Sequence, residues 1–334
     1  MNKELIFISA QPSDLMFVWQ IRTQLYNFRE LGYSHLYRIL IYVRSGETLP
    51  DEWKELSKDY PEAKFFFYLD NDNIQERIIN PVGYIGLLRP YLLSNHFFEF
   101  PELSNKAVFY IDSDVLFTEK INFDKFLNDE INYGSDCRWY LSGKYFESKG
   151  KDVLPERISL YKTRNILNEL SALTGIKFDT IRNNELNTIG AQYLLKGIDH
   201  KFWVNVFADT IKIYQYLNYK HSGINKQFFE SEEKGFQSHC ADMWALLWNL
   251  WKEERQTKTD DEFNFYWSTS NKKETAKKIY HDAGITKQDA DKSQLPKKIF
   301  FKHDYKNTIP VLNLDEYDNG LMNSWYVEQI KKAV

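Results

Sequence analysis

The stretch 108-VFYIDSDVLF-117 places Asp112 and Asp114 directly after a run of apolar and aromatic residues. Such a continuous run is typical of a strand that is buried on both faces of a sheet. Two carboxylates one residue apart at the end of that strand can reach a divalent cation directly or through water, and hard oxygen ligands favour Mg²⁺ or Mn²⁺. The alternative is that the two aspartates only begin a turn or cap a helix.

Three further apolar runs precede this stretch, at residues 5–9, 37–43 and 64–70. Helical patterns separate them; in the first, over residues 13–32, Ser13 or Asp14 can cap the start and Gly32 can form the end. This alternation predicts an α/β fold with a Rossmann-like, mostly parallel sheet flanked by helices. Ligands bind such sheets at the carboxyl ends of the strands, where residues 9–11, Asp70, Asp112 and Asp114 are found.

The pattern loosens from about residue 121, where polar stretches precede helices predicted over residues 157–175 and 240–255. No internal repeat or low-complexity linker separates independent units. We therefore expect one continuous compact domain. Residues 1–120 form its first half, residues 121–300 an α+β half, and residues 301–334 a tail that wraps back.

The composition excludes several classes of protein. The chain of 334 residues has 43 Lys and Arg against 47 Asp and Glu, so it lacks the basic excess of proteins whose affinity comes from nucleic-acid phosphates. Two cysteines, Cys137 and Cys240, are too few for a disulfide framework. No run of 18 apolar residues is present, and the first apolar run is short for a signal peptide. We expect no membrane anchor and a cytoplasmic location, the host cytoplasm if the protein is viral.

The stretch 109-FYIDSDVLF-117 resembles the Asp-x-Asp motif of nucleotide-sugar-dependent glycosyltransferases of the GT-A fold, and its place after three strands agrees with that fold. Downstream, 279-IYHDAGI-285 and 297-KKIFFKHDY-305 resemble the His-x-x-Gly and later Lys of the glycogenin-like family, although that family's Lys follows more closely. The resemblance implies that Asp112, Asp114 and His281 hold Mn²⁺ or Mg²⁺. The candidate residues for binding the donor nucleotide are Ala10 and Gln11 at the end of the first strand, Arg89, Asp112 and Ser113, together with Gly284 and Lys302, which the glycogenin-like resemblance implies.

A third motif, 86-GLLRPYLL-93, resembles the Arg-Pro helix before Asp-x-Asp in hydroxyproline arabinosyltransferases and the related serine galactosyltransferases. The resemblance implies that Arg89 faces the donor diphosphate or sugar, where a planar guanidinium clamps two oxygens. The alternative is a solvated arginine before a helix break at Pro90. The segments 187–207 and 235–251 loosely resemble the middle segment and the acidic helix of the same group.

Within the helix predicted over residues 240–255, Asp242 lies off the apolar stripe of Trp244, Leu247, Trp248 and Trp251. Asp242 and Arg89 are the candidate catalytic residues. Asp242 acts as the base for an acceptor hydroxyl if the enzyme inverts and orients the sugar if it retains, or it is only a first-turn Asp favoured by the helix dipole.

Aromatic residues of the second half either stack on a sugar or base or belong to the core: Trp139, Tyr140, Trp203, Trp244 and Trp267. The segment 139-WYLSGKYF-146 is expected over the donor sugar, with Ser142 and Gly143 allowing close approach.

The motifs together predict a metal-dependent glycosyltransferase, either a hexosyltransferase or a pentosyltransferase, that uses a nucleotide diphosphate sugar, with a UDP-sugar preferred. The acceptor hydroxyl belongs to a glycan, a protein or a hydroxymethylpyrimidine in DNA, and the last is motivated by the lysines at 272, 273, 277, 278, 297 and 298. Two alternatives remain open. One is a haloacid-dehalogenase-like phosphatase, in which the first Asp attacks phosphorus and Thr or Val is usual where Leu116 stands; the other is a carbohydrate- or nucleic-acid-binding module.

Overall fold

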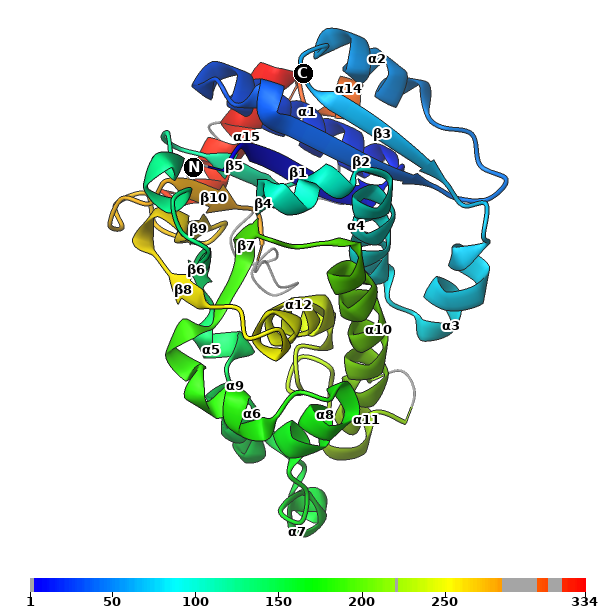
Figure 1. Ribbon diagram of the computed structural model, residues 1–334, viewed down its shortest axis with the longest axis vertical. Coiled ribbons are helices and arrows are strands. Elements are labelled where there is room, and N and C mark those ends of the chain that lie inside the picture. The colour runs from blue at the N-terminus through cyan, green and yellow to red at the C-terminus, as the bar shows by residue number, and fades with distance from the viewer. Residues whose placement is uncertain (1–2, 220–221, 284–304, 312–319) are drawn as a thin grey trace.

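The computed structural model of the protein describes residues 3–219, 222–283, 305–311 and 320–334. Its centre is a seven-stranded sheet in the order β3-β2-β1-β4-β7-β6-β8, and a smaller sheet in the order β5-β10-β9 lies beside it (Figure 1). The mixed α/β class and the mostly parallel sheet predicted from the sequence are confirmed.

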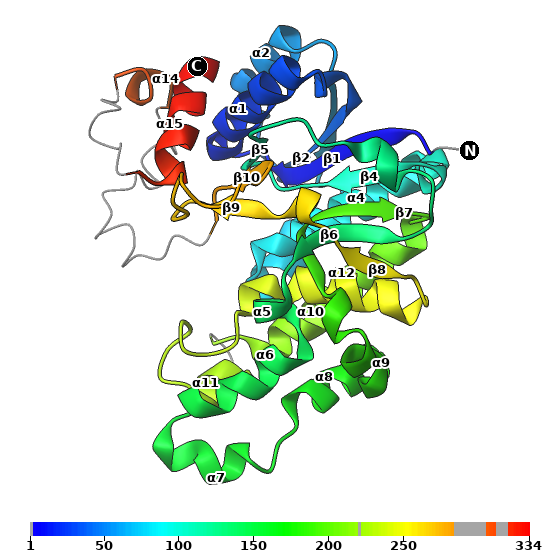
Figure 2. The same cartoon turned by 90° about the vertical axis from the view of Figure 1, so that its left-hand side faces the viewer.

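The parallel part of the large sheet comes from the first third of the chain. Its strands are β1 (Leu5–Pro12), β2 (Tyr37–Val43), β3 (Lys64–Leu69) and β4 (Ala107–Tyr110). β1 pairs in parallel with β2 and β4, and β2 pairs in parallel with β3. The central strands are buried along almost their whole length, because helices cover both faces of the sheet (Figure 2).

On one face lie α1 (Leu15–Leu31), α2 (Asp51–Asp59) and the C-terminal α15 (Met322–Ala333), which packs against α1. Gly32 ends α1 in the left-handed conformation, with φ 79°, as predicted. Asp14 precedes α1 but makes no side-chain cap; its carboxylate pairs with Arg44 at 2.8 Å.

The opposite face is covered by α4 (Leu88–Glu99). The short segments η2 (Gln75–Ile79, π-helical), α3 (Asn80–Val82) and η3 (Ile85–Leu87, a 3-10 turn) lead into it. Pro90 lies in the first turn of α4, where backbone N–H groups have no partner within the helix. The proline therefore does not break the helix.

The second half extends the sheet with mixed pairing. β7 (Ile189–Lys196) is antiparallel to β4 and to β6 (Asn132–Asp136), and β8 (Thr257–Thr259) is parallel to β6. Below this edge, α10 (His200–Leu217) packs against both α4 and α12 (Ala241–Lys252). The remaining helices of this half are α5 (Arg138–Leu141), α6 (Gly143–Ser148), α7 (Ile158–Tyr161), α8 (Ile166–Thr174), α9 (Phe178–Asn183) and α11 (Ile224–Phe228).

The single helix predicted over residues 157–175 is wrong. The chain forms α7 and α8 instead, because the Asn165 side chain accepts a hydrogen bond from the Asn168 backbone N–H at 3.0 Å and starts α8 anew. In Figure 1, α7 lies at the far end of this half, away from the sheet.

The small sheet joins three distant segments. β5 (Val115–Phe117) follows the two aspartates and runs antiparallel to β10 (Ile279–His281), which is parallel to β9 (Phe265–Trp267). The short α14 (Tyr305–Thr308) contacts α2 through a Lys306–Glu55 ion pair at 2.8 Å. Within the described ranges, no helix combines the length and apolarity needed to cross a membrane.

Candidate functional site

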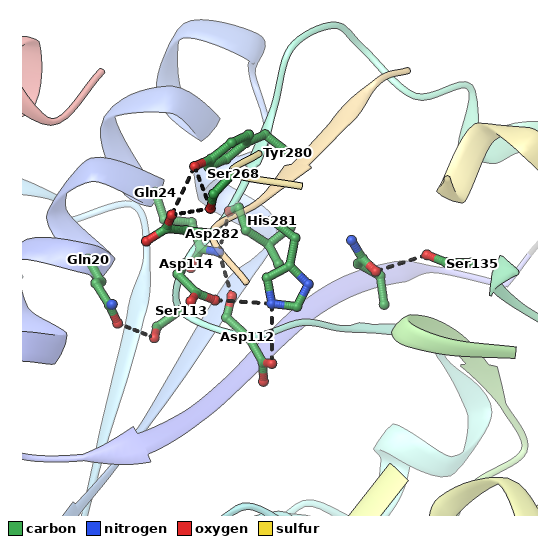
Figure 3. A network of polar contacts seen from close by, with 12 residues as sticks. Gln20, Gln24, Asp112, Ser113, Asp114, Ser135, Ser268, Tyr280, His281 and Asp282 are labelled. Carbon is green, nitrogen blue, oxygen red and sulfur yellow. Dashed lines mark hydrogen bonds and ion pairs between the residues drawn. The ribbon is translucent and has the colours of Figure 1, made fainter. Parts of the chain in front are cut away.

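Asp112, Asp114 and His281 come together at the carboxyl end of β4. His281 Nε2 lies 3.4 Å from Asp114 Oδ1 and 3.7 Å from Asp112 Oδ2. One ligand atom from each of the three residues falls within 4.8 Å of the others. Asp114 and His281 are buried and Asp112 is partly exposed. Figure 3 shows the imidazole facing both carboxylates.

The pairing of β5 with β10 explains why segments so far apart in the sequence meet here. Val115 pairs with His281 in this ladder, and the backbone N–H of Asp282 donates to Asp114 O at 3.1 Å. Asp282 Oδ1 accepts hydrogen bonds from Ser268 Oγ at 2.6 Å and Tyr280 OH at 2.9 Å (Figure 3). These contacts anchor the chain directly after His281 and so fix the position of its side chain.

Helix α1 holds the loop of the two aspartates from behind. Gln24 Nε2 donates to Asp112 O at 2.9 Å and to Val115 O at 2.7 Å. Ser113 Oγ donates to Gln20 Oε1 at 2.7 Å. The sequence reasoning missed Gln20 and Gln24, yet both are buried on a helix whose other buried residues are mostly apolar. Amides one turn apart on such a face were the signal that could have revealed them.

The donor set fits a hard divalent cation. Two carboxylates supply oxygen ligands, the imidazole supplies a nitrogen, and their spacing lets one ion touch all three. His281 Nε2 is the nitrogen available to an ion because it faces the two aspartates, whereas the buried Nδ1 has no hydrogen-bond partner among the described residues.

Arg89 links this cluster to Asp242. Its Nη1 lies 2.6 Å from Asp112 Oδ1, and its Nη2 lies 2.9 Å from Asp242 Oδ2. Burial lowers the pKa of the Arg89 guanidinium, but the negative charges of Asp112 and Asp242 outweigh it and raise that pKa well above the ordinary value. The bridge is therefore a permanently charged one.

Asp242 lies in the first turn of α12 and is buried. Burial raises the pKa of its carboxyl, against the opposing effects of the Arg89 charge and of the Tyr84 hydroxyl, which donates to Asp242 Oδ1 at 2.6 Å. Tyr84 stacks on Tyr214 with ring centroids 4.5 Å apart. No pattern in the sequence marks Tyr84, because its contact with Asp242 joins positions far apart in the chain.

Two cavities meet at this cluster, and Arg89 and Asp112 line both. The smaller has a volume of about 230 Å³, and its lining includes Ala10, Gln11, Gln20, Ser113 and Asp114. The larger has a volume of about 560 Å³. Its lining includes Asp242, His239, His281, Trp139, Tyr140, Tyr193, Trp203 and Trp267.

The other expected residues take various positions. Gly284, Lys297, Lys298 and Lys302 lie outside the described residues. Trp244 belongs to the core, where its Nε1 donates to Leu141 O at 3.1 Å. The carboxylate of Asp70 accepts from the backbone N–H groups of Ile74 and Gln75, so it caps the next segment. Ser142 and Gly143 are buried and line neither cavity, although Trp139 and Tyr140 of the same segment line the larger one.

Neither a protein-family model nor a curated protein matches the sequence. Among solved structures, the chain is similar to the WbbM bifunctional glycosyltransferase, with a TM-score of 0.47 and 11% identity over 98% of this chain and 52% of that chain. It thus spans about half the length of that protein. It is also similar to mouse xyloside xylosyltransferase 1, with a TM-score of 0.39 and 11% identity over 84% of this chain and 97% of that chain. A third is core-mannan synthase A from Aspergillus fumigatus in a Mn/GDP form, with a TM-score of 0.28 and 12% identity over 70% of this chain and 72% of that chain.

Proposed function

We propose that the protein is a metal-dependent glycosyltransferase of the GT-A type, which moves a sugar from a nucleotide diphosphate sugar, a UDP-sugar by preference, to an acceptor hydroxyl. The observation that carries the proposal is the convergence of Asp112, Asp114 and His281 at the junction of the two cavities. The resemblance of the Asp-x-Asp and His-x-x-Gly motifs supports it.

In this proposal Asp114 and His281 hold Mn²⁺ or Mg²⁺ directly, and Asp112 contacts the ion through water or contacts the donor ribose. When bound, the cation neutralises negative charge on the departing diphosphate. The buried backbone contacts of Asp114 and Asp282 keep two of the ligands in place before the ion arrives.

The smaller cavity receives the nucleotide. Ala10 and Gln11, at the end of β1, and Ser113 form part of its wall. Arg89 faces both cavities, so its guanidinium is placed to contact the diphosphate on one side and the transferred sugar on the other. Gly284 and Lys302 complete the donor site by resemblance.

The larger cavity receives the transferred sugar and the acceptor. Asp242 accepts the proton of the acceptor hydroxyl in an inverting transfer and orients the sugar in a retaining one. Burial raises the pKa of its carboxyl toward neutral pH, and a general base works best when its pKa lies near the operating pH. The hydrogen bond from Tyr84 fixes the orientation of the carboxylate.

A donor screen tests this function. The protein is incubated with Mn²⁺ and a panel of nucleotide sugars, and the release of free nucleotide diphosphate is measured. Asp114→Ala should abolish the release, while the exposed Asp72→Ala serves as the matched control and should retain it. Unchanged turnover by Asp114→Ala would remove the metal-site assignment. Hydrolysis of a generic aryl phosphate without any reaction of nucleotide sugars would favour the phosphatase alternative.

A further inference from the structure

Two tryptophans mark the entrance of the larger cavity. Trp139 lines this cavity although 62% of it is exposed to solvent. Its ring lies 5.8 Å from that of Trp267, at an interplanar angle of 70°, and Trp267 lines the same cavity. Tryptophan side chains are highly buried on average. An exposed indole beside a cavity that contains polar groups therefore indicates a ligand-binding surface.

Both indoles are supported by ordered neighbours. Trp267 ends β9 and pairs in register with His281 of β10, and its backbone N–H donates to Ser270 Oγ at 3.1 Å. Trp139 belongs to α5 and packs edge-on against Tyr140, with ring centroids 4.6 Å apart. Trp267 is thus tied to the strand that carries the proposed metal ligand, and Trp139 approaches from a different element.

The charge around this cavity disfavours a polyanionic acceptor. Arg89 is the single Arg or Lys among the described residues that line it, and two carboxylates already share its guanidinium. The nearby lysines of the segment before β10 are also paired: Lys277 lies 3.3 Å from Glu274, and Lys278 lies 2.8 Å from Glu262. Within the part of the chain that the structure describes, a nucleic-acid phosphate in this cavity would meet Asp112 and Asp242, and Arg89 is already shared between these two carboxylates.

The lining has an apolar wall and a polar end. Pro90, Val206, Met243 and Leu246 form part of the wall, and Asp242 and His239 contribute polar groups. A sugar ring has matching parts, because its C–H face is apolar and its edge carries hydroxyls. The volume of about 560 Å³ lies within the range of small-molecule sites.

We propose that Trp139 and Trp267 form the binding subsite for a saccharide acceptor, in which the C–H face of a sugar ring stacks on an indole and a ring hydroxyl points toward Asp242. The acceptor is therefore a glycan or glycoside rather than a base in DNA. This inference rests on the proposed function, because it names the acceptor class of the same site.

Saccharide binding is tested first without any donor. Saturation-transfer NMR is recorded with methyl glycosides of glucose, galactose, mannose and xylose. We expect saturation at the ring C–H protons of at least one glycoside and its loss in Trp139→Ala and Trp267→Ala, with partial recovery in Trp139→Phe. The matched control is Phe98→Ala, because Phe98 is an aromatic residue with 73% exposure on α4 that lines neither cavity.

Turnover is tested second, with the active donor and the best-binding glycoside. Trp139→Ala should raise the KM for the glycoside about tenfold, the size expected for losing one aromatic stacking contact, whereas the control Phe98→Ala should leave that KM unchanged. Failure of donor hydrolysis in the native protein would count against the proposed function and not against saccharide binding, which the NMR experiment measures separately.

Three results would overturn the subsite. The first is that no glycoside shows saturation transfer, and the second is that both tryptophan variants bind the glycoside like the native protein. The third is that duplex DNA with hydroxymethylated pyrimidines, or a hydroxyl-bearing peptide, accepts the sugar with a higher kcat/KM than every saccharide tested.

Discussion

The two cavities that meet at Arg89 are built in different ways. The smaller is lined mainly by residues at the ends of β1 and β4 and by the start of α1. The larger is lined by side chains from β7, α5, α10, α12 and β9, most of which are distant from one another in the chain. The first depends on strand topology, and the second depends on how the helices of the second half pack.

This difference implies that the donor and acceptor sides respond separately to substitution. In the proposed function, a change in the larger cavity should affect transfer and spare the nucleotide, and a change in the smaller one should do the reverse. Arg89 and Asp112 are exceptions because they line both cavities, and His281 is a third, because it lines the larger cavity but is a proposed metal ligand.

Asp242→Asn is expected to give the largest difference between the effect on sugar transfer and the effect on nucleotide binding. The amide keeps the shape of the side chain but cannot accept the acceptor's proton, so we expect kcat to fall by about 10²–10⁴-fold. Affinity for Mn²⁺ and nucleotide, measured by calorimetry, should stay unchanged. A parallel loss of nucleotide affinity would contradict the separate roles of the two cavities, because it would show that Asp242 also contributes to donor binding.

The pH profile of kcat/KM extends this test. An ordinary Asp has a pKa of about 3.9. Because burial raises the pKa of the Asp242 carboxyl, this group takes up a proton at a higher pH. As the pH is lowered, the activity of the native protein should therefore begin to fall at a pH above the ordinary Asp pKa. The residual activity of Asp242→Asn should lack this acidic limb; an identical limb in the variant would assign it to another group.

Arg89→Gln should affect both sides, with a loss of transfer of about 10²-fold, because a charged contact is lost in each cavity. Without nucleotide the same variant should bind Mn²⁺ more tightly, since the guanidinium that lies 2.6 Å from Asp112 no longer competes with the ion. Mn²⁺ affinity is measured by electron paramagnetic resonance. Weaker binding of Mn²⁺ would show that Arg89 instead positions Asp112 for the ion.

His96 lies outside both cavities, and its substitution should change the pH dependence of stability instead of activity. It is buried between α4 and the parallel sheet, with its Nδ1 2.6 Å from Tyr68 OH, and burial together with the Arg38 charge lowers its pKa from 6.5 to about 3. The unfolded chain takes up a proton at this residue near pH 6.5, so its contribution to stability is complete above that pH. It is lost toward pH 3, by up to about 1.4 kcal/mol per pH unit.

His96→Phe should flatten the acid dependence of the free energy of unfolding, measured by urea denaturation between pH 7 and pH 4. The exposed His35→Gln is the control and should keep the native slope. An unchanged slope in His96→Phe would place the acid-sensitive group elsewhere.

The smallest effect is expected for Gln20→Ala in the smaller cavity. Ser113 loses the partner that its hydroxyl donates to at 2.7 Å, which costs about 1 kcal/mol of stability. We expect the KM for the donor to rise a few-fold and the KM for the acceptor to stay constant in steady-state assays. A selective rise in the acceptor KM would contradict the separation of the two sides.

The parallel half could be predicted from the sequence because its signals are local. Each central strand is a continuous apolar run, and Gly32 ends the first helix as expected. The convergence of Asp112, Asp114 and His281 was predicted from resemblance, since no local pattern shows that β5 pairs with β10.

The larger cavity was less accessible to sequence reasoning. The sequence placed Asp242 off the apolar stripe of α12, but the structure buries both sides of this helix, and the contact of the Tyr84 hydroxyl with Asp242 could not be foreseen. Among five candidate aromatic residues, the sequence could not separate the buried Trp244 from the exposed Trp139, because exposure depends on which elements pack nearby. The periodicity of a sequence predicts which face of a helix is apolar, but it does not predict which other elements pack against that face.

The ladder between β5 and β10 also has a consequence for biosynthesis. A cation held by Asp114 and His281 would cross-link two segments separated by most of the second half, and so would close a long loop of the chain. A nascent polypeptide on the ribosome carries both aspartates long before the histidine is made. In the proposed function, the ion site would therefore form only when the second half has been synthesised and folded, and incomplete chains would not bind the nucleotide sugar.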